Sequence, residues 1–318
     1  MRNIPSLFLS GILALGALVP GPAGAGSFRA PIRIVVPQAP GGGTDLIARL
    51  VAPGLSRELG QNVIVENKAG ASGQLGSQLV KNAAPDGSTI LCAVDHSLII
   101  VPLTVPDVRY TVSDFVPLGQ GVRTVWALTF PPNAPYKDFR EYVAALKKEP
   151  QLRAYGVPLA GGATGVIADA IGKHAGVEMT AVPFAGSAPV LQNVMAGQIP
   201  AGLTGMPEAM AAYRGGKARV VAVSGAARTP LLPEVPTFRE LGIDGLEFHT
   251  FVGFFGPKGF PPAMAQEFNA ALRKALADPA VQDKITQMAL QPAPTTLEEA
   301  SREVSELARF WKTALAAK

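Results

Sequence analysis

A glycine-rich segment, Pro40 to Thr44, has the residue types that suit binding of a small anion. It follows an apolar, β-branched run over residues 32–36, which is typical of a buried strand. Apolar residues then recur at helical spacing, and Thr44 is predicted to be the N-cap of that helix. Because the first amides of a helix are unpaired and its dipole is positive there, bare backbone can hold an anion without a basic side chain. An ordinary strand-to-helix turn, whose glycines only relieve strain, has the same spacing.

Glycine-rich loops follow predicted strands at three further places, over residues 69–73, 158–165 and 184–188. In α/β sheets such loops gather at the carboxyl edge of the strands, where ligands bind. Another predicted strand, over residues 89–94, is followed by the polar pair Asp95 and His96 at that edge. Recurrence of these loops in both halves of the chain favours a ligand-binding cleft between two lobes.

Motifs of catalysis and metal binding are hard to find in this chain. His96, His174 and His249 lack the spacing of metal ligands, and neither a P-loop nor a G-x-S-x-G elbow occurs. Asp45 has the chemistry of a general base, but an acid in a first helical turn is more typically stabilised by the helix dipole. We therefore expect no catalytic residue, no metal and no cofactor. A small secreted hydrolase that uses Ser72 with His96 is the less favoured alternative.

The first 25 residues are typical of a cleavable signal peptide rather than of the fold. Arg2 supplies a positive start, residues 7–18 form an apolar core, and residues 23–25 form a small-residue cleavage site. The rest of the chain is long enough for two domains of about 100–200 residues each. Cys92 is the only cysteine, which excludes an internal disulfide. The net charge of +4 is scattered along the chain, so we expect no nucleic-acid partner.

Predicted strands and helices alternate along the chain, which places it in the α/β class. A second series of strand–helix units begins near residue 125, which indicates two similar lobes. Residues 105–122 have little periodicity and are expected to form a meandering crossover. We also predict a helix over residues 166–175 and a short helix from Pro236 to Gly242.

Several motifs together resemble the Bug (TctC-like) extracytoplasmic solute receptors of tripartite tricarboxylate transporters. The most specific pieces are Pro40-Gly41-Gly42-Gly43-Thr44-Asp45, Val65-Glu66-Asn67, Pro85-Asp86-Gly87, Val182-Pro183-Phe184 and Val235-Pro236-Thr237. The resemblance implies a periplasmic-binding-protein type II fold, in which a two-strand hinge joins two α/β lobes. The expected organisation is a signal peptide over 1–25, lobe 1 over 26–126 and 248–318, and lobe 2 over 127–247.

The resemblance also implies a function, which is that of a periplasmic, monomeric and non-catalytic receptor. The expected ligand is a small carboxylate, such as an amino acid, a di- or tricarboxylate or an aromatic acid. The expected partners are the membrane permease subunits of a tripartite tricarboxylate transporter. A ligand sensor that signals to a membrane sensor kinase is the alternative, because sensing and transport need the same closure of the lobes.

Carried onto this chain, the resemblance assigns the ligand to glycine-rich loops of both lobes. One ligand carboxylate is expected on backbone amides and ordered waters of the first two loops. The expected ligand-binding residues are Gly41, Gly42, Gly43, Thr44, Ala71, Ser72, His96, Gly161, Gly162, Thr164, Ala185, Gly186 and Ser187. Gln38 stands where the family usually has an aromatic residue, and Phe251 stands in the place of a frequent Trp. The first of these differences changes the expected shape and polarity of the pocket.

Overall fold

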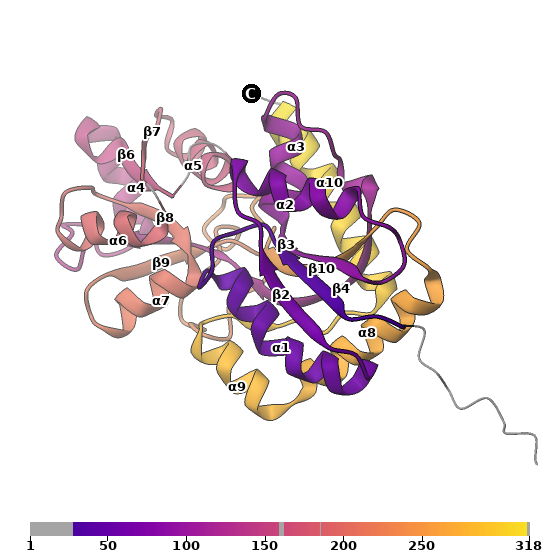
Figure 1. Cartoon of the computed structure of the whole chain (residues 1–318). Helices are drawn as coiled ribbons and strands as arrows, with labels where there is room; N and C mark the ends of the chain where they lie inside the picture. Colours follow the sequence, from indigo (N-terminus) through magenta and orange to yellow (C-terminus); the bar gives the residue numbers. More distant parts are fainter. Residues whose placement is uncertain (1–27, 159–161, 185, 317–318) are drawn as a thin grey trace, which may run out of the picture.

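Strands and helices alternate in the computed structural model, which describes residues 28–158, 162–184 and 186–316 (Figure 1). The strands are β1 (Ile32–Val36), β2 (Val63–Asn67), β3 (Thr89–Val94), β4 (Phe115–Thr124), β5 (Trp126–Phe130), β6 (Ala154–Val157), β7 (Thr180–Pro183), β8 (Gly202–Gly205), β9 (Arg219–Val223), β10 (Thr250–Pro257) and β11 (Gln291–Pro292). The α-helices are α1 (Gly43–Leu59), α2 (Gln74–Lys81), α3 (Val101–Thr104), α4 (Phe139–Lys148), α5 (Gly162–Ala175), α6 (Ser187–Met195), α7 (Met206–Arg214), α8 (Pro262–Ala277), α9 (Pro279–Gln287) and α10 (Leu297–Ala316). The predicted α/β class is confirmed.

Two sheets form the centres of two lobes. The larger sheet has the strand order β11-β4-β10-β3-β1-β2, with β1 parallel to β2 and β3 and with β10 antiparallel to β3 and β4. The smaller sheet has the order β7-β6-β8-β5-β9, with β6 parallel to its neighbours and β5 antiparallel to its own. Parallel neighbours need long crossovers, and helices supply them here.

The chain passes between the two sheets twice, at adjacent places. Only Val125 separates the end of β4 in the larger sheet from the start of β5 in the smaller one. The return runs from β9 to β10, and Thr250 at the start of β10 pairs with Thr124 at the end of β4. The two crossing segments therefore lie side by side, as a two-strand hinge requires. The exact lobe boundaries at 126/127 and 247/248 stay a prediction.

The larger sheet is covered on one face by α1 and α8. The two helices approach closely, since a Cβ at Gly54 of α1 would lie 2.6 Å from the Cβ of Ala275 in α8. Ile34, Ile47 and Phe268 are completely buried in the same cluster. Full burial of one such side chain stabilises the folded state by about 1.5–3 kcal/mol. This packing fixes the direction in which α1 leaves the first glycine-rich loop.

A second apolar cluster joins the two lobes. It includes Trp311 of α10, Phe255 of β10 and Phe130 of β5, each at most 1% exposed.

Cys92, in the middle of β3, is completely buried, and burial raises the pKa of its thiol. Among the described residues, no helix is long and apolar enough to cross a membrane.

The predicted crossover over residues 105–122 is wrong in its second half, which forms the long strand β4. This strand pairs with β10 along its length and also with β11, and its register with β10 shifts at two irregularities. Gly119, at a φ of +144°, and Pro117 weaken the local strand pattern in the sequence. Pairing on both edges outweighs that weak propensity, which is a non-local effect.

The helix predicted from Pro236 to Gly242 is also wrong, because this segment forms a bridge followed by turns. Val223 donates its backbone N–H to Pro236, and Phe238 donates its own to Val223, which extends the pairing of β9. Phe238 is completely buried. The Thr237 hydroxyl still accepts the backbone N–H of Glu240, as in a helix cap, but the helix does not continue.

Candidate ligand-binding site

The loop from β1 to α1 presents bare backbone at the start of a helix. Gly41 has a φ of +80°, a left-handed conformation that glycine adopts without strain. The N-cap of α1 is Gly42, which has no side chain to accept a hydrogen bond from the first amides of the helix. Thr44 therefore lies inside α1, and its prediction as the N-cap is wrong. With no capping side chain, the amides of the first turn are available to an anion.

Asp45 holds this loop in place. Its carboxylate accepts hydrogen bonds from the backbone N–H of Gly41 (2.9 Å), from Arg49 Nε (3.0 Å) and from Asn67 Nδ2 (2.9 Å). Burial alone would raise the pKa of this carboxyl, but the hydrogen bonds from Arg49, Gly41 and Asn67 outweigh burial and lower it. Asp45 therefore stays ionised and ties the first loop to the end of β2.

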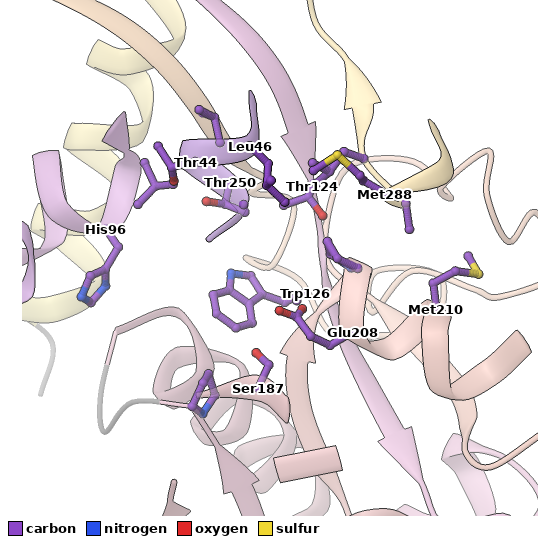
Figure 2. Close-up of a pocket in the computed structure, with 18 of the residues that line it drawn as sticks. Thr44, Leu46, His96, Thr124, Trp126, Ser187, Glu208, Met210, Thr250 and Met288 are labelled. Carbon is purple, nitrogen blue, oxygen red and sulfur yellow. The ribbon is translucent and has the colours of Figure 1, made fainter. Parts of the chain in front are cut away.

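A cavity of about 720 Å³ lies between the two lobes (Figure 2). Both lobes, both crossing segments and the connection from α9 to β11 contribute to its wall. It is lined by Gln38, Gly41, Gly43, Thr44, Leu46, Val94, Asp95, His96, Ile100, Thr124, Trp126, Pro158, Gly162, Ala163, Thr164, Ser187, Gly205, Pro207, Glu208, Met210, Ala211, Arg214, Thr250, Val252, Gln287, Met288, Ala289 and Leu290. An interlobe cavity that combines apolar side chains with polar groups from both lobes is typical of a small-molecule site.

Four helices direct their first turns to this cavity. Gly43 and Thr44 bring the start of α1, Gly162 and Thr164 bring the start of α5, and Ser187 brings the start of α6. The fourth is α7, whose first residues also line the wall. Each helix N-terminus carries roughly half a positive charge. The first turns of α1, α5 and α6 therefore favour an anion in the cavity, while the first turn of α7 already contains an acidic residue.

The structure brings together seven of the expected ligand-binding residues, since Gly41, Gly43, Thr44, His96, Gly162, Thr164 and Ser187 all line the cavity. Gly42, Ala71, Ser72 and Gly186 do not line it. Gly161 and Ala185 lie outside the described residues. Contact with the ligand stays a prediction at every one of these positions.

Two differences from prediction affect this part of the site. The helix predicted over residues 166–175 begins four residues earlier, at Gly162, so Gly162 and Thr164 belong to its first turn. Ser72 has a φ of +56° in a tight turn before α2, outside the cavity that His96 lines. Among the described residues no hydrogen bond joins Ser72 to His96, so the nucleophile and base of the hydrolase hypothesis are not assembled.

Trp126 and Thr124 were not predicted from the sequence as site residues, yet they flank the first crossing and line the cavity. Trp126 Nε1 and Thr124 Oγ1 are both buried without a hydrogen-bond partner among the described residues. A buried donor without a partner costs about 1–3 kcal/mol, so a ligand that accepts these hydrogen bonds would gain affinity. The signal in the sequence was a tryptophan at the predicted entry to the second lobe.

Among the described residues, the wall of the cavity contains no buried cation. Burial lowers the pKa of His96, which is therefore neutral at pH 7. Burial also raises the pKa of Asp95 to about 6, although a hydrogen bond from the Thr250 hydroxyl opposes the shift. Arg214 lines the wall but is exposed. An anion bound deep in the cavity must therefore be held by backbone dipoles and hydrogen bonds.

Metal binding has no support in the geometry. Within residues 28–158, 162–184 and 186–316, no group of three His, Cys, Asp or Glu side chains is placed to hold a metal ion.

Comparison with known proteins gives the family. The model of the "Tripartite tricarboxylate transporter family receptor" (TctC) matches residues 47–316, so the chain belongs to this receptor family. The "UPF0065 protein in tcbD-tcbE intergenic region" of Pseudomonas sp. strain P51 is 32% identical over 83% of this chain and 79% of its own. "Protein BugT" of Bordetella pertussis is 27% identical over 96% of this chain and 94% of its own. The resemblance inferred from the sequence motifs is confirmed.

Solved structures agree with this assignment. MatC from Rhodopseudomonas palustris "with bound malate" is 27% identical, with a TM-score of 0.71 over 90% of this chain and 98% of its own. Rpa4515 of R. palustris "with adipate" is 26% identical, with a TM-score of 0.77 over 90% of this chain and 96% of its own. The periplasmic-binding-protein fold expected from the resemblance is confirmed, and the chain is a receptor rather than an enzyme.

Proposed function

We propose that this protein is a periplasmic receptor that binds a small carboxylate in the interlobe cavity and delivers it to permease subunits of a tripartite tricarboxylate transporter. The observation that carries the proposal is the convergence of the first turns of α1, α5 and α6 on one cavity between two lobes. Such termini bind a carboxylate through backbone amides and need no basic side chain. The malate and adipate complexes of its structural neighbours support a carboxylate ligand.

Ligand binding is tested by calorimetry and thermal shift on the chain from Gly26 onward. Small carboxylates are compared with their amides, which have similar size but no charge. A native-state ligand raises the melting temperature by mass action. A rise with one carboxylate and none with its amide supports the proposal, and no response to any carboxylate contradicts it.

Transport and sensing are separated by an uptake experiment, since both need the same closed receptor. Cells with and without this chain are supplied with the labelled ligand. Uptake that disappears with the chain supports delivery to a permease. Unchanged uptake, together with lost induction of genes by the ligand, supports the sensor-kinase alternative.

A further inference from the structure

Glu208 places a carboxylate in the cavity wall of the second lobe. It is the third residue of α7, and it lines the cavity together with Pro207 and Met210. Gly205, the N-cap of α7, leaves room for it, because a Cβ there would lie 3.0 Å from Glu208 Oε2. Figure 2 shows the Glu208 carboxylate and the Trp126 indole directed into the same part of the cavity.

Glu208 has no cationic partner among the residues that the structure describes. Burial raises the pKa of its carboxyl, and the one hydrogen bond to this carboxylate among the described residues comes from its own backbone N–H. Asp95, the other acid of the wall, differs because it accepts a hydrogen bond from Thr250. Arg214, the basic residue of the same helix, is exposed and lies six positions further along α7. Glu208 is thus an acid of the cavity wall to which none of the described residues supplies a cation.

The dipole of α7 does not explain this position. An acid in the first turn of a helix is stabilised whether it faces solvent or a cavity. Burial in the cavity wall adds a desolvation cost that an exposed acid would avoid. The first turns of α5 and α6, which also reach the cavity, contain no acidic residue. The first turn of α7 therefore differs from those of α5 and α6 because it brings a carboxylate to the cavity wall.

We propose that Glu208 is a specificity-determining residue that selects ligands with a cationic amine opposite their carboxylate. The inference rests on the proposed function and takes the ligand carboxylate to bind at the first turn of α1. An amine would give the half-buried Glu208 carboxylate a cationic partner, which none of the described residues supplies. A second ligand carboxylate in the same place would meet a like charge in a site of low dielectric. Glu208 therefore favours amino acids over dicarboxylates of equal length.

The test compares amino acids and dicarboxylates with equal numbers of carbon atoms. The pairs are γ-aminobutyrate with succinate, δ-aminovalerate with glutarate and ε-aminohexanoate with adipate. Calorimetry on the wild-type chain is expected to show one length at which the amino acid binds about 10-fold or more tightly than its dicarboxylate. The best length measures the separation of the two subsites.

Variants identify the residue responsible. Glu208→Gln keeps the shape of the side chain and removes its charge, so it should weaken the amino acid about 10-fold and leave the dicarboxylate equal or stronger. Glu178→Gln, which changes an exposed acid of the same lobe, should alter neither affinity. The preference for the amino acid over the dicarboxylate is measured on the wild-type chain, so it tests the role of Glu208 even if Glu208→Gln does not fold.

The possible outcomes separate this inference from the proposed function. Tighter binding of the dicarboxylate at every length overturns the role of Glu208 while supporting a carboxylate receptor. An amine preference that survives Glu208→Gln also overturns it. Failure of all carboxylates, with or without an amine, contradicts the proposed function itself.

Discussion

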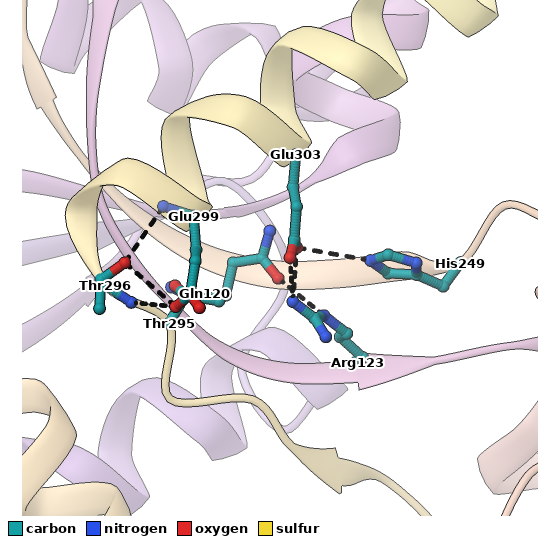
Figure 3. Close-up of polar contacts among 7 residues, drawn as sticks. All are labelled: Gln120, Arg123, His249, Thr295, Thr296, Glu299 and Glu303. Carbon is teal, nitrogen blue, oxygen red and sulfur yellow. Dashed lines mark hydrogen bonds and ion pairs between the residues drawn. The ribbon is translucent and has the colours of Figure 1, made fainter.

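Arg123, near the end of β4, forms an ion pair with Glu303 on α10 (Figure 3). The same carboxylate lies 3.8 Å from Nε2 of His249, which immediately precedes β10. One carboxylate of the C-terminal helix therefore contacts both segments by which the chain crosses between the lobes. Burial alone would raise the pKa of Glu303, but the interactions with His249 and Arg123 outweigh burial and lower it.

Glu303→Gln should destabilise the fold at neutral pH by about 1–3 kcal/mol, because the ion pair with Arg123 is lost. The pKa of Glu303 is lower in the folded protein than in the unfolded chain, where it lies near 4.5. The ionised carboxylate therefore stabilises the fold fully at pH values above 4.5, and this stabilisation is lost as the pH falls through the folded-state pKa. Denaturant unfolding at pH 7 and in acid measures the difference. Glu306→Gln, an exposed change on the same helix, is the control. A stability loss that is equal at both pH values would contradict the ion-pair explanation.

Asp45→Asn should loosen the first-lobe loop. The neutral side chain cannot accept all the hydrogen bonds from Gly41, Arg49 and Asn67, so unfolding should become easier by about 1–3 kcal/mol. Carboxylate affinity should fall as well, because the Gly41 amide is no longer held. Thermal unfolding and calorimetry measure the two effects, with the exposed change Asp283→Asn as a control. Unchanged affinity would show that the loop keeps its shape without Asp45.

Gly43→Val should abolish carboxylate binding while leaving the fold stable. A Cβ at Gly43 meets no protein atom within 4 Å, and this glycine has no positive φ that would strain a larger residue. The added side chain would instead occupy space beside the first amides of α1. Gly42 is a poorer test, because a Cβ there would lie 3.3 Å from the carbonyl oxygen of Ala39. Calorimetry that finds wild-type affinity for Gly43→Val would exclude this loop as the carboxylate site.

Trp126→Phe should have opposite effects on stability and binding. Removal of the unpartnered Nε1 donor should leave the unliganded protein equal in stability or about 1 kcal/mol more stable. Loss of a hydrogen bond to the ligand should weaken binding about 5- to 10-fold. Trp311→Phe is the matched control, because its Nε1 is also buried without a partner among the described residues but lies in the core. Equal affinity for the wild type and Trp126→Phe would mean that the ligand does not accept this hydrogen bond.

The local patterns of the sequence predicted the parts of the fold that depend on local structure. The glycines before α1, the alternation of strands and helices and the place of His96 at a strand end could all be found from spacing. β4 was missed because its stability comes from pairing with β10 and β11 rather than from its own residues. The segment around Phe238 was misread for the same reason, since its pairing with β9 is long-range.

The candidate site was less predictable than the fold. The loop residues could be inferred because glycine at a strand end has a local signature. Glu208 could not be inferred, because an acid in the first turn of a helix has the same pattern whether it faces solvent or a cavity. The residues from Gln287 to Leu290 reach the wall only because the chain after α9 returns to the larger sheet at β11. Such long-range placement has no counterpart in a local motif.

Cys92, the only cysteine of the chain, is completely buried in β3, and the pKa of its thiol is raised. Thiolate is the reactive form of cysteine, so this residue should resist labelling reagents under native conditions. A cysteine introduced on the surface of each lobe would then be modified selectively, without first removing the natural one. Spin labels or fluorophores at such positions would measure the distance between the lobes directly, with and without ligand.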